Sequence, residues 1–402
     1  MDVHGARADG VEPRCRILVA GVGGGACNVL DHALADWPDP PPVAGVNTDA
    51  RALSETGIAL KVMIGKTVGK GMGAGGDAEL GRLAANEDLD ALRSLLSGYD
   101  LLLLVASLGG GTGTGAAPVL AQLARDAGLL TLAFVTTPFA FEGARRQEQA
   151  QEGLSALKQV ADAVVCLPNQ RLHAMLSPGT PLVDAFAFVD RMVSAGLRGL
   201  WTLLARDNML NLDFSDVQSL VENSGNECCF GYGEGRGPDK AAQALRELLD
   251  GPMLEKGRVI ANSGAMILSV AGGPDLSLAE LESIHKRFQE AARPGARISM
   301  GAAVLDGWEG QLALTVLAAE HWMPSARDAA APSAPGGLFF EEAPPAADGA
   351  SRHFRKGGHQ SVLPLEASAN DTGRFQDVAP TLYDGANLDI PTFMRRGIRI
   401  PT

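Results

Sequence analysis

A glycine-rich turn between a hydrophobic stretch and a helical pattern most constrains what this chain can fold into. Residues 109–115 read GGGTGTG, residues 100–108 have the length and hydrophobicity of a buried strand, and residues 116–127 have helical apolar spacing. Such a unit points backbone N–H groups at an anion, and glycine permits positive φ and removes Cβ atoms that would obstruct a phosphate. The candidate phosphate ligands are Gly110, Gly111, Thr112, Gly113 and Thr114.

The charge pattern limits the ligands of this chain. No lysine follows the turn, so it is not a P-loop ending in Gly-Lys-Ser/Thr. Phosphate charge must therefore be met by backbone dipoles, threonine hydroxyls and a metal ion. The formal net charge of −13 argues against nucleic acid as a partner, because binding to its phosphate backbone needs a basic face.

Length and composition describe a globular chain with room for two domains and tails. The 402 residues are 46% hydrophobic and 20% charged. The five cysteines show neither metal-ligand nor disulfide-framework spacing, and no apolar run approaches about 20 residues. We expect a cytoplasmic protein with reduced thiols and no direct insertion into a membrane.

A second glycine turn opens the chain. Residues 16–20 predict a strand, residues 21–28 (GVGGGACN) a turn, and the following residues a helix to about 35. A further strand at 43–46 ends beside Asn47 and Asp49, and Asp49 lies about where a ribose-binding acid follows a dinucleotide fingerprint. A nicotinamide-dependent dehydrogenase is therefore an alternative at this point. The candidate ligands in the turn are Gly24, Gly25, Ala26, Cys27 and Asn28.

A third glycine turn favours a triphosphate. Residues 69–79 (GKGMGAGGDAE) lead into a helical pattern that reaches residue 96, and Gly75, Gly76 and Asp77 are candidate ligands. Parallel strands gather their loops at one edge of a sheet, where ligands bind. One pyrophosphate needs one such loop, whereas three converging loops suit a triphosphate. The dehydrogenase alternative also needs a hydride-transfer site in a second domain, and the sequence indicates none.

Polar residues at the ends of later elements each leave two interpretations open. Glu142 and Arg146 are four apart, as in a solvated ion pair or a pair of ligands. Asn169 follows a strand predicted at 163–167 and is either a turn residue or an amide that reads a base. Asp190 lies in a helix predicted at 181–205, where a lone aspartate is usually solvated. One carboxylate can, however, accept both the N1–H and the N2–H of guanine.

The helix predicted at 181–205 carries an apolar stripe that we assign to the core alone: Val183, Phe186, Val189, Val193, Leu197, Leu200 and Leu204. Asn211, Asp213 and Asp216 follow it. Asp213 could cap a helix that begins near residue 215, or the two acids could act chemically, and their spacing alone decides neither.

The pattern changes after about residue 226 to that of a smaller α+β domain without glycine phosphate loops. Helices are predicted at 240–249 and 278–291, and strands at 265–270, 297–304 and 311–317. Residues from 323 to about 385 are rich in Ala, Pro and Gly and predict a disordered linker. Residues 387–396 (NLDIPTFMRR) are apolar and then basic, which is typical of a partner-binding peptide.

The GGGTGTG motif and the residues around it resemble the FtsZ family of the tubulin superfamily. The resemblance runs from about residue 17 to 319 and returns at 389–396. It implies an α/β fold, with a Rossmann-like parallel-sheet GTPase domain joined by a long central helix to a smaller α+β domain. The implied boundaries are a flexible N-terminus at 1–14, a GTP-binding domain at 15–180, the central helix at 181–205, a catalytic loop and helix at 206–225, the α+β domain at 226–320, a linker at 321–386 and a tail peptide at 387–402.

The resemblance also implies roles for residues. GTP is cradled by residues 24–28, 75–77 and 111–113, with Mg²⁺ held mainly through the nucleotide phosphates and water. Glu142 and Arg146 contact the ribose and phosphate end, while Asn28, Asn169 and Asp190 read guanine. Asn211, Asp213 and Asp216 match the catalytic loop, which acts on the GTP of the next subunit in a head-to-tail filament.

The implied function is assembly-coupled GTP hydrolysis in the division ring at mid-cell, on the inner face of the membrane. The peptide that begins at Asp389 and ends at Arg396 resembles the one that binds membrane-anchoring and regulatory division proteins. A GTP-binding paralogue that co-assembles with weak or no hydrolysis is the alternative.

The sequence departs from the family pattern in three places. Asp77 stands where the family usually has Asn, and Ala78 where it often has Pro. A carboxylate next to the expected γ-phosphate predicts slower hydrolysis or weaker GTP affinity. Ala26 and Cys27 replace glycines, and Cys27 is an oxidation-sensitive point if it is exposed. The chain also continues past Arg396 to residue 402, which would alter recognition of the tail.

Overall fold

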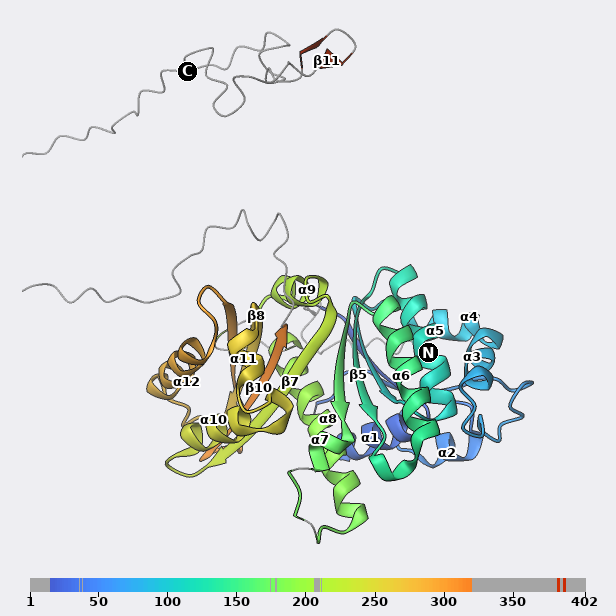
Figure 1. Ribbon diagram of the computed structural model, residues 1–402, viewed down its shortest axis with the longest axis horizontal. Helices are drawn as coiled ribbons and strands as arrows, with labels where there is room; N and C mark the ends of the chain where they lie inside the picture. Colours follow the sequence, from blue (N-terminus) through green and yellow to red (C-terminus); the bar gives the residue numbers. More distant parts are fainter. Residues whose placement is uncertain are drawn as a thin grey trace, which may run out of the picture. The chain divides into compact units, whose positions relative to one another are not determined.

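The computed structural model describes residues 15–35, 37, 39–173, 175–177, 179–205, 210 and 212–319, with the pairs 382–383 and 386–387 (Figure 1). The chain divides into two compact units, Met1–Ala334 and Pro335–Thr402. In the second unit, β11 (Leu382–Tyr383) pairs antiparallel with β12 (Ala386–Asn387). The first unit carries all the other described elements, including the strands of a ten-stranded sheet.

The first half of this unit is a parallel sheet in the order β3-β2-β1-β4-β5-β6. Its central strands are continuously hydrophobic because helices cover both of their faces. The strands are β1 (Ile17–Val22), β2 (Val43–Asn47), β3 (Leu60–Met63), β4 (Leu101–Ser107), β5 (Leu130–Thr137) and β6 (Ala163–Pro168).

Two hydrophobic layers sandwich this sheet. One layer contains α1 (Gly24–Ala35), α2 (Ala50–Glu55) and α8 (Leu182–Ala205), which pack on alternate residues of β1, β4, β5 and β6. The other contains α3 (Ala78–Glu87), α4 (Leu89–Leu96), α5 (Gly111–Asp126) and α6 (Ala144–Val160). The single helix expected to reach residue 96 is thus two helices that meet at Asp88.

The second half joins the same sheet through β7 (Asn226–Arg236). Residues 226–228 of β7 pair parallel with β6, and residues 229–236 pair antiparallel with β10 (Gln311–Ala319). β8 (Ala265–Gly272) follows β10, and β9 (Arg297–Val304) is the edge strand at this end of the ten-stranded sheet. The helical elements here are α9 (Phe214–Glu222), α10 (Lys240–Asp250), η2 (Pro252–Leu254), α11 (Arg258–Asn262) and α12 (Leu278–Ala291).

Strand β7 is an element that the sequence pattern did not predict. Its glycines at 231, 233 and 235 lower the apparent strand propensity. They are needed because the strand lies directly under η2 and α10. A Cβ at Gly233 would lie 2.3 Å from the carbonyl oxygen of Ala244, and one at Gly235 would lie 1.9 Å from that of Lys240.

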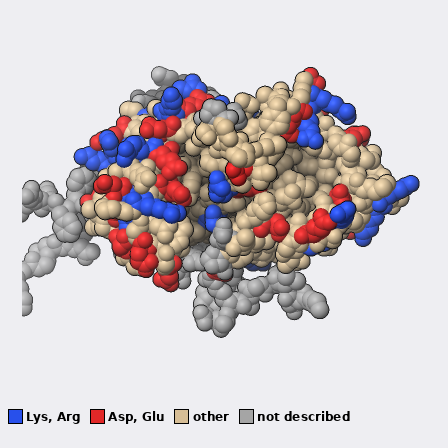
Figure 2. All heavy atoms as spheres, turned by 90° about the horizontal axis from the view of Figure 1, so that it is seen from below, with Lys and Arg blue, Asp and Glu red and all other residues tan. Residues whose placement is uncertain are grey.

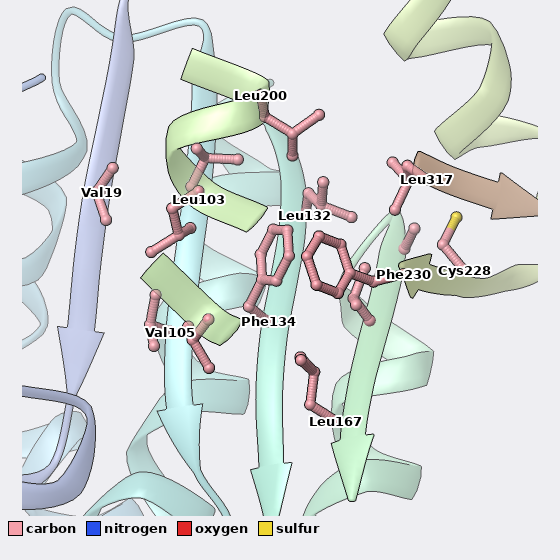
Figure 3. Close-up of a cluster of buried hydrophobic side chains, with 14 of the residues drawn as sticks. Val19, Leu103, Val105, Leu132, Phe134, Leu167, Leu200, Cys228, Phe230 and Leu317 are labelled. Carbon is pink, nitrogen blue, oxygen red and sulfur yellow. The ribbon is translucent and has the colours of Figure 1, made fainter. Parts of the chain in front are cut away.

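Helix α8 packs on both halves of the sheet. Phe134 of β5 and Phe230 of β7 meet edge to face with ring centroids 6.2 Å apart (Figure 3). A Cβ at Gly196 would lie 2.9 Å from the Phe230 ring and 3.0 Å from that of Phe134, so glycine allows α8 to approach both. Neither α8 nor any other helix in the described ranges is long and apolar enough to cross a membrane.

The apolar stripe of α8 is core only in part. From Val189 to Leu204 its members are buried as expected. Val183, however, is 78% exposed and Phe186 is 40% exposed. Assigning both to the core was wrong, because Val183 is open to solvent and Phe186 borders a cavity.

Candidate functional site

A cavity of about 500 Å³ opens where the parallel strands end. Ser107, Thr136 and Asn169, at or just after the ends of β4, β5 and β6, line it together with the N-terminal turns of α1 and α5. Figure 2, which views the molecule from below, shows a hollow bordered mainly by uncharged residues. The carboxyl edge of a parallel sheet is the usual position for a ligand.

The GGGTGTG segment is less of a turn than the sequence suggested. Helix α5 begins at Gly111, with Gly110 at its N-cap, so residues 111–115 are already helical. A Cβ at Gly110 would meet nothing within 4 Å, whereas one at Gly115 would lie 1.9 Å from the carbonyl oxygen of Ala78. Gly110 therefore leaves the cavity open, while Gly115 allows α3 to pack closely on α5.

The two threonines of this segment have different environments. Thr112 lines the cavity, and its Oγ1 lies 2.6 Å from Oγ1 of Thr48. Thr114 is buried away from the cavity lining, and its Oγ1 accepts a 2.9 Å hydrogen bond from the backbone N–H of Gly109, which has φ +94°. Thr114 thus holds the turn in place. Thr48 was not recognised from the sequence, because its partner Thr112 is distant along the chain.

The glycine turn at residues 21–28 brings part of its candidate set to the cavity. Gly24, Gly25 and Asn28 line it. Ala26 and Cys27 lie behind them with side chains almost fully buried. Burial raises the pKa of the Cys27 thiol to about 12. Cys27 is therefore not exposed, as sensitivity to oxidation would require. Its raised pKa also disfavours the thiolate, which is the reactive form.

Asn47, the last residue of β2, and Asp49, two residues later, hold the backbone that follows this strand. The side-chain oxygen of Asn47 accepts a 2.8 Å hydrogen bond from the N–H of Thr48, and its Nδ2 is buried with no partner among the described residues. Asp49 caps α2 by accepting a 2.9 Å hydrogen bond from the N–H of Ala52. Neither residue is in the cavity lining.

The third glycine turn, at 74–77, lies beside the cavity without lining it. Asp77 caps α3, its Oδ1 accepting hydrogen bonds from the N–H groups of Glu79 (2.9 Å) and Leu80 (3.3 Å). Gln149 of α6 donates from Nε2 to the carbonyl oxygens of Gly76 (3.1 Å) and Gly110 (3.2 Å). Gln149, which sequence reasoning missed, thus links the third turn to the GGGTGTG segment. Gly75, like Gly76, has open space where a Cβ would be.

One end of the cavity carries polar side chains suited to a planar base. Asn169 is 6% exposed, and its Oδ1 has no hydrogen-bond partner among the described residues. An unpaired buried acceptor is costly unless a ligand donates to it. Asp190 lines the same cavity, and its Oδ2 lies 2.8 Å from Nδ1 of His32. Burial raises the pKa of Asp190, and the hydrogen bond from His32 partly offsets this.

Glu142 and Arg146 form the ion pair that their spacing permitted, at the cavity wall. Nη1 of Arg146 lies 2.6 Å from Oε2 of Glu142, and Oε1 of Glu142 accepts a hydrogen bond from the N–H of Phe139. Glu142 closes the short helix η1 (Ala140–Glu142), which only Gly143 separates from the start of α6. Both side chains line the cavity, so a ligand would meet them as a pair.

The acidic residues after α8 lie at the opposite edge of the sheet. Asp213 is exposed at the N-cap of α9, and its side chain makes no capping hydrogen bond. Asp216, in the first turn of α9, accepts at Oδ1 from Nη2 of Arg297 (2.8 Å) and from Oγ of Ser299 (3.4 Å). Asn211 lies outside the described residues.

The separation between cavity and acids follows from the elements that connect them. Helix α9 leads into β7, whose Asn226 pairs with Ala163, the first residue of β6, while the cavity begins after the last residue of that strand. Along α8, the rise from Asp190 to its end at residue 205 is about 22 Å. Figure 1 accordingly shows α9 at the end of the sheet opposite to α1 and α7 (Asn169–His173). The acids of one chain therefore lie far from its own cavity.

Comparisons with known proteins agree with this architecture. Residues 16–177 match the Tubulin/FtsZ family, GTPase domain, and residues 227–321 match the FtsZ family, C-terminal domain. The chain is 38% identical over 288 residues to cell division protein FtsZ 1 of Archaeoglobus fulgidus, covering 72% of this chain and 77% of that protein.

Two solved structures share the fold. An FtsZ dimer of M. jannaschii matches with a TM-score of 0.71 and 32% identity, covering 76% of this chain and 88% of that one. The GTPγS-bound CetZ2 protofilament of Haloferax volcanii matches with a TM-score of 0.63, 24% identity and coverages of 78% and 96%, which supports the fold alone. The two family domains and the similarity over most of the chain establish that it belongs to the FtsZ family of tubulin-like GTPases.

Proposed function

We propose that this protein polymerises head-to-tail in the presence of GTP, and that acidic residues of each subunit complete hydrolysis of the GTP held by its neighbour. The observation that carries the proposal is the position of Asp213 and Asp216 at the sheet edge opposite to the cavity. A single chain cannot bring these two parts together across about 20 Å of sheet. Subunits stacked along the strand direction would place the acids of one subunit next to the cavity of the next.

The cavity fits guanosine triphosphate at both of its ends. The N-terminal N–H groups of α1 and α5 suit phosphates, and the open space at Gly110 leaves room for them. Asn169, with its unpaired buried Oδ1, together with Asn28 and Asp190 would read the base. Guanine presents adjacent N1–H and N2–H donors, which Asn169 and Asp190 can accept, whereas adenine has no such pair. Glu142 and Arg146 would meet the ribose and phosphate end.

We assign the metal requirement to Mg²⁺ held mainly by the nucleotide phosphates and water. Within the described residues, no three His, Cys, Asp or Glu side chains are grouped to hold a metal ion. When bound, Mg²⁺ would offset the charge that develops on the phosphates. The protein's own part in hydrolysis is to orient phosphates through backbone N–H groups and to polarise the attacking water through Asp213 and Asp216.

Electrostatics favours the arrangement between subunits. A carboxylate about 4 Å from one phosphate charge is repelled by roughly 4 kcal/mol at an effective dielectric constant of 20. Two such groups inside one cavity would weaken binding of the nucleotide. When a neighbour supplies them, they meet the nucleotide only in the filament, so that hydrolysis is coupled to assembly.

The cellular role that we propose is formation of the division ring. The Archaeoglobus relative is named as a cell division protein, and the M. jannaschii relative was solved as a dimer. We place the filament at mid-cell on the inner face of the membrane. The peptide from Asp389 to Arg396, which lies outside the described residues, would bind membrane-anchoring and regulatory division proteins.

A second candidate is a paralogue that binds GTP and co-assembles but hydrolyses weakly or not at all. The Asp77 carboxylate favours it, because it lies on the turn that Gln149 links to Gly110 and would repel the terminal phosphate. Asp213 and Asp216 favour the hydrolysing alternative.

Phosphate release measured against protein concentration tests the proposal. With GTP and Mg²⁺, the rate is expected to stay low until light scattering detects polymer, and then to rise more steeply than linearly. A straight line through the origin would indicate a complete active site in each monomer and contradict the proposal. Polymer without phosphate release would support the paralogue.

A further inference from the structure

Strand β9 anchors the acidic segment that precedes and begins α9. Leu210 and Ala302 of β9 exchange backbone hydrogen bonds of 3.3 and 3.1 Å. Arg297 and Ser299 are two apart on the same strand, so their side chains lie on one face. Both donate to Asp216, and both hydrogen bonds end on the same oxygen, Oδ1.

The two acids of this segment are therefore held differently. Asp213 is exposed, and its side chain makes no capping hydrogen bond. The Asp216 side chain is 25% exposed and pairs with a guanidinium that is 41% exposed. With Oδ1 engaged by two donors, Oδ2 is the oxygen that can accept from a further group, and the two donors together restrict the orientation of the carboxylate.

We propose that Arg297 is a positioning residue for hydrolysis between subunits. It holds Oδ1 of Asp216 so that Oδ2 can accept a hydrogen bond from the attacking water in the neighbour's site. It also cancels one of the two negative charges that the acidic segment brings to a tetra-anionic nucleotide. This inference rests on the proposed function, because it needs Asp216 to meet a neighbour's GTP.

The alternative interpretation is an ordinary surface ion pair. Partly exposed pairs contribute little to stability, so a purely structural pair predicts a small change in melting temperature and no change in turnover. A positioning role predicts the reverse. Removing Arg297 would then lower kcat per polymerised subunit, while nucleotide affinity, critical concentration and melting temperature stay near the wild-type values.

The test compares full-length variants for phosphate release per polymerised subunit, sedimentation and melting temperature. Arg297→Gln is expected to lower kcat at least about tenfold, because small misplacements of a catalytic group cost that much or more. Arg297→Lys keeps the charge and is expected to recover most of the loss. Ser299→Ala is expected to cost roughly twofold to threefold, since its 3.4 Å hydrogen bond is the weaker one. Arg293→Gln removes the same charge from an exposed position just before β9 and is expected to change nothing.

Asp216→Asn separates failure of the inference from failure of the proposed function. If Asp216→Asn loses turnover while Arg297→Gln keeps it, Arg297 positions nothing and only the inference is overturned. If Asp216→Asn itself turns over like the wild type, hydrolysis between subunits fails as well. Should Arg297→Gln unfold, Ser299→Ala decides, and wild-type turnover in that variant would overturn the inference.

Discussion

The cavity at the carboxyl edge of the sheet and the acidic segment at the opposite edge are built in different ways. The cavity is formed by backbone, glycines and the buried amide of Asn169, on helices packed against a parallel sheet. The acidic segment consists of partly exposed side chains at the start of α9, held by Arg297 and Ser299 of an edge strand. A pocket that binds its ligand within one chain can be buried and preformed. Groups that act on a neighbour have to be exposed.

The largest expected effect comes from substitutions in the acidic segment. Asp216→Asn and Asp213→Asn should each lower polymer turnover by about a hundredfold, the scale of a lost proton-transfer group, without changing GTP affinity in dilute protein. Phosphate release and equilibrium binding measure the two quantities separately. Asp239→Asn is the matched control, because Asp239 sits at the N-cap of α10 with no side-chain capping bond, as Asp213 does in α9. Loss of GTP binding in either acid variant would place that acid in its own chain's cavity.

At the cavity, substitutions of two glycines in the GGGTGTG motif should separate effects on stability from effects on nucleotide binding. Gly115→Ala should destabilise the fold by roughly 1–3 kcal/mol, because its Cβ would overlap the carbonyl oxygen of Ala78. Gly110→Asp should fold normally, since open space surrounds that position and its φ is −93°, but its carboxylate should repel the phosphates and abolish GTP binding. Denaturant unfolding and nucleotide binding measure each variant. Equal effects of the two on stability would refute this division of roles.

Base recognition should depend on pH through Asp190. Burial raises the pKa of this carboxyl, so it protonates at a higher pH than an exposed aspartate. The ionised form accepts hydrogen bonds from guanine. GTP affinity should therefore be highest above the raised pKa and fall by about tenfold as the pH drops through it. His32→Gln removes the hydrogen bond that lowers this pKa and should move the midpoint to higher pH. Asp190→Asn should bind weakly and show no such midpoint, and a midpoint that survives in it would assign the titration to another group.

The smallest effect is expected at Asp77. Asp77→Asn keeps a side chain that can cap α3, so stability should change by only a few tenths of a kcal/mol. Removing the charge beside the third turn should raise GTP affinity or kcat a few-fold. Steady-state kinetics on polymer gives both constants. If neither KM nor kcat changes, the carboxylate is too distant from the terminal phosphate to matter.

The sequence predicted most elements of the sheet because buried parallel strands are continuous hydrophobic runs. Besides the four-residue β3, it missed β7, where glycines at 231, 233 and 235 make room for η2 and α10 and remove the apolar signal. It also placed the start of α5 too late. The glycines of residues 111–115 lower helix propensity, but close packing requires them. Gly111 and Gly115 allow α3 and its N-cap to approach, and Gly113 allows α5 to approach the ends of β1 and β4. In both places tertiary packing overrides the local preference.

The candidate site was predictable where motif and ligand geometry coincide, and not where residues act through distant partners. Gly110, Asn28 and Asn169 line the cavity directly. His32 and Gln149 were missed because their roles arise only from contacts with Asp190, 158 positions away, and with the turns at Gly76 and Gly110. Arg297 likewise meets Asp216 across 81 positions. No local pattern encodes such pairs.

A mixing experiment tests most directly whether each molecule carries half of a hydrolytic centre. Asp216→Asn retains the cavity, and Gly110→Asp retains the acids, so neither should hydrolyse GTP alone. In a co-sedimenting equimolar mixture, about a quarter of head-to-tail interfaces would join an intact cavity to intact acids, and turnover should recover to that extent. A mixture that co-sediments and stays inactive would contradict the account.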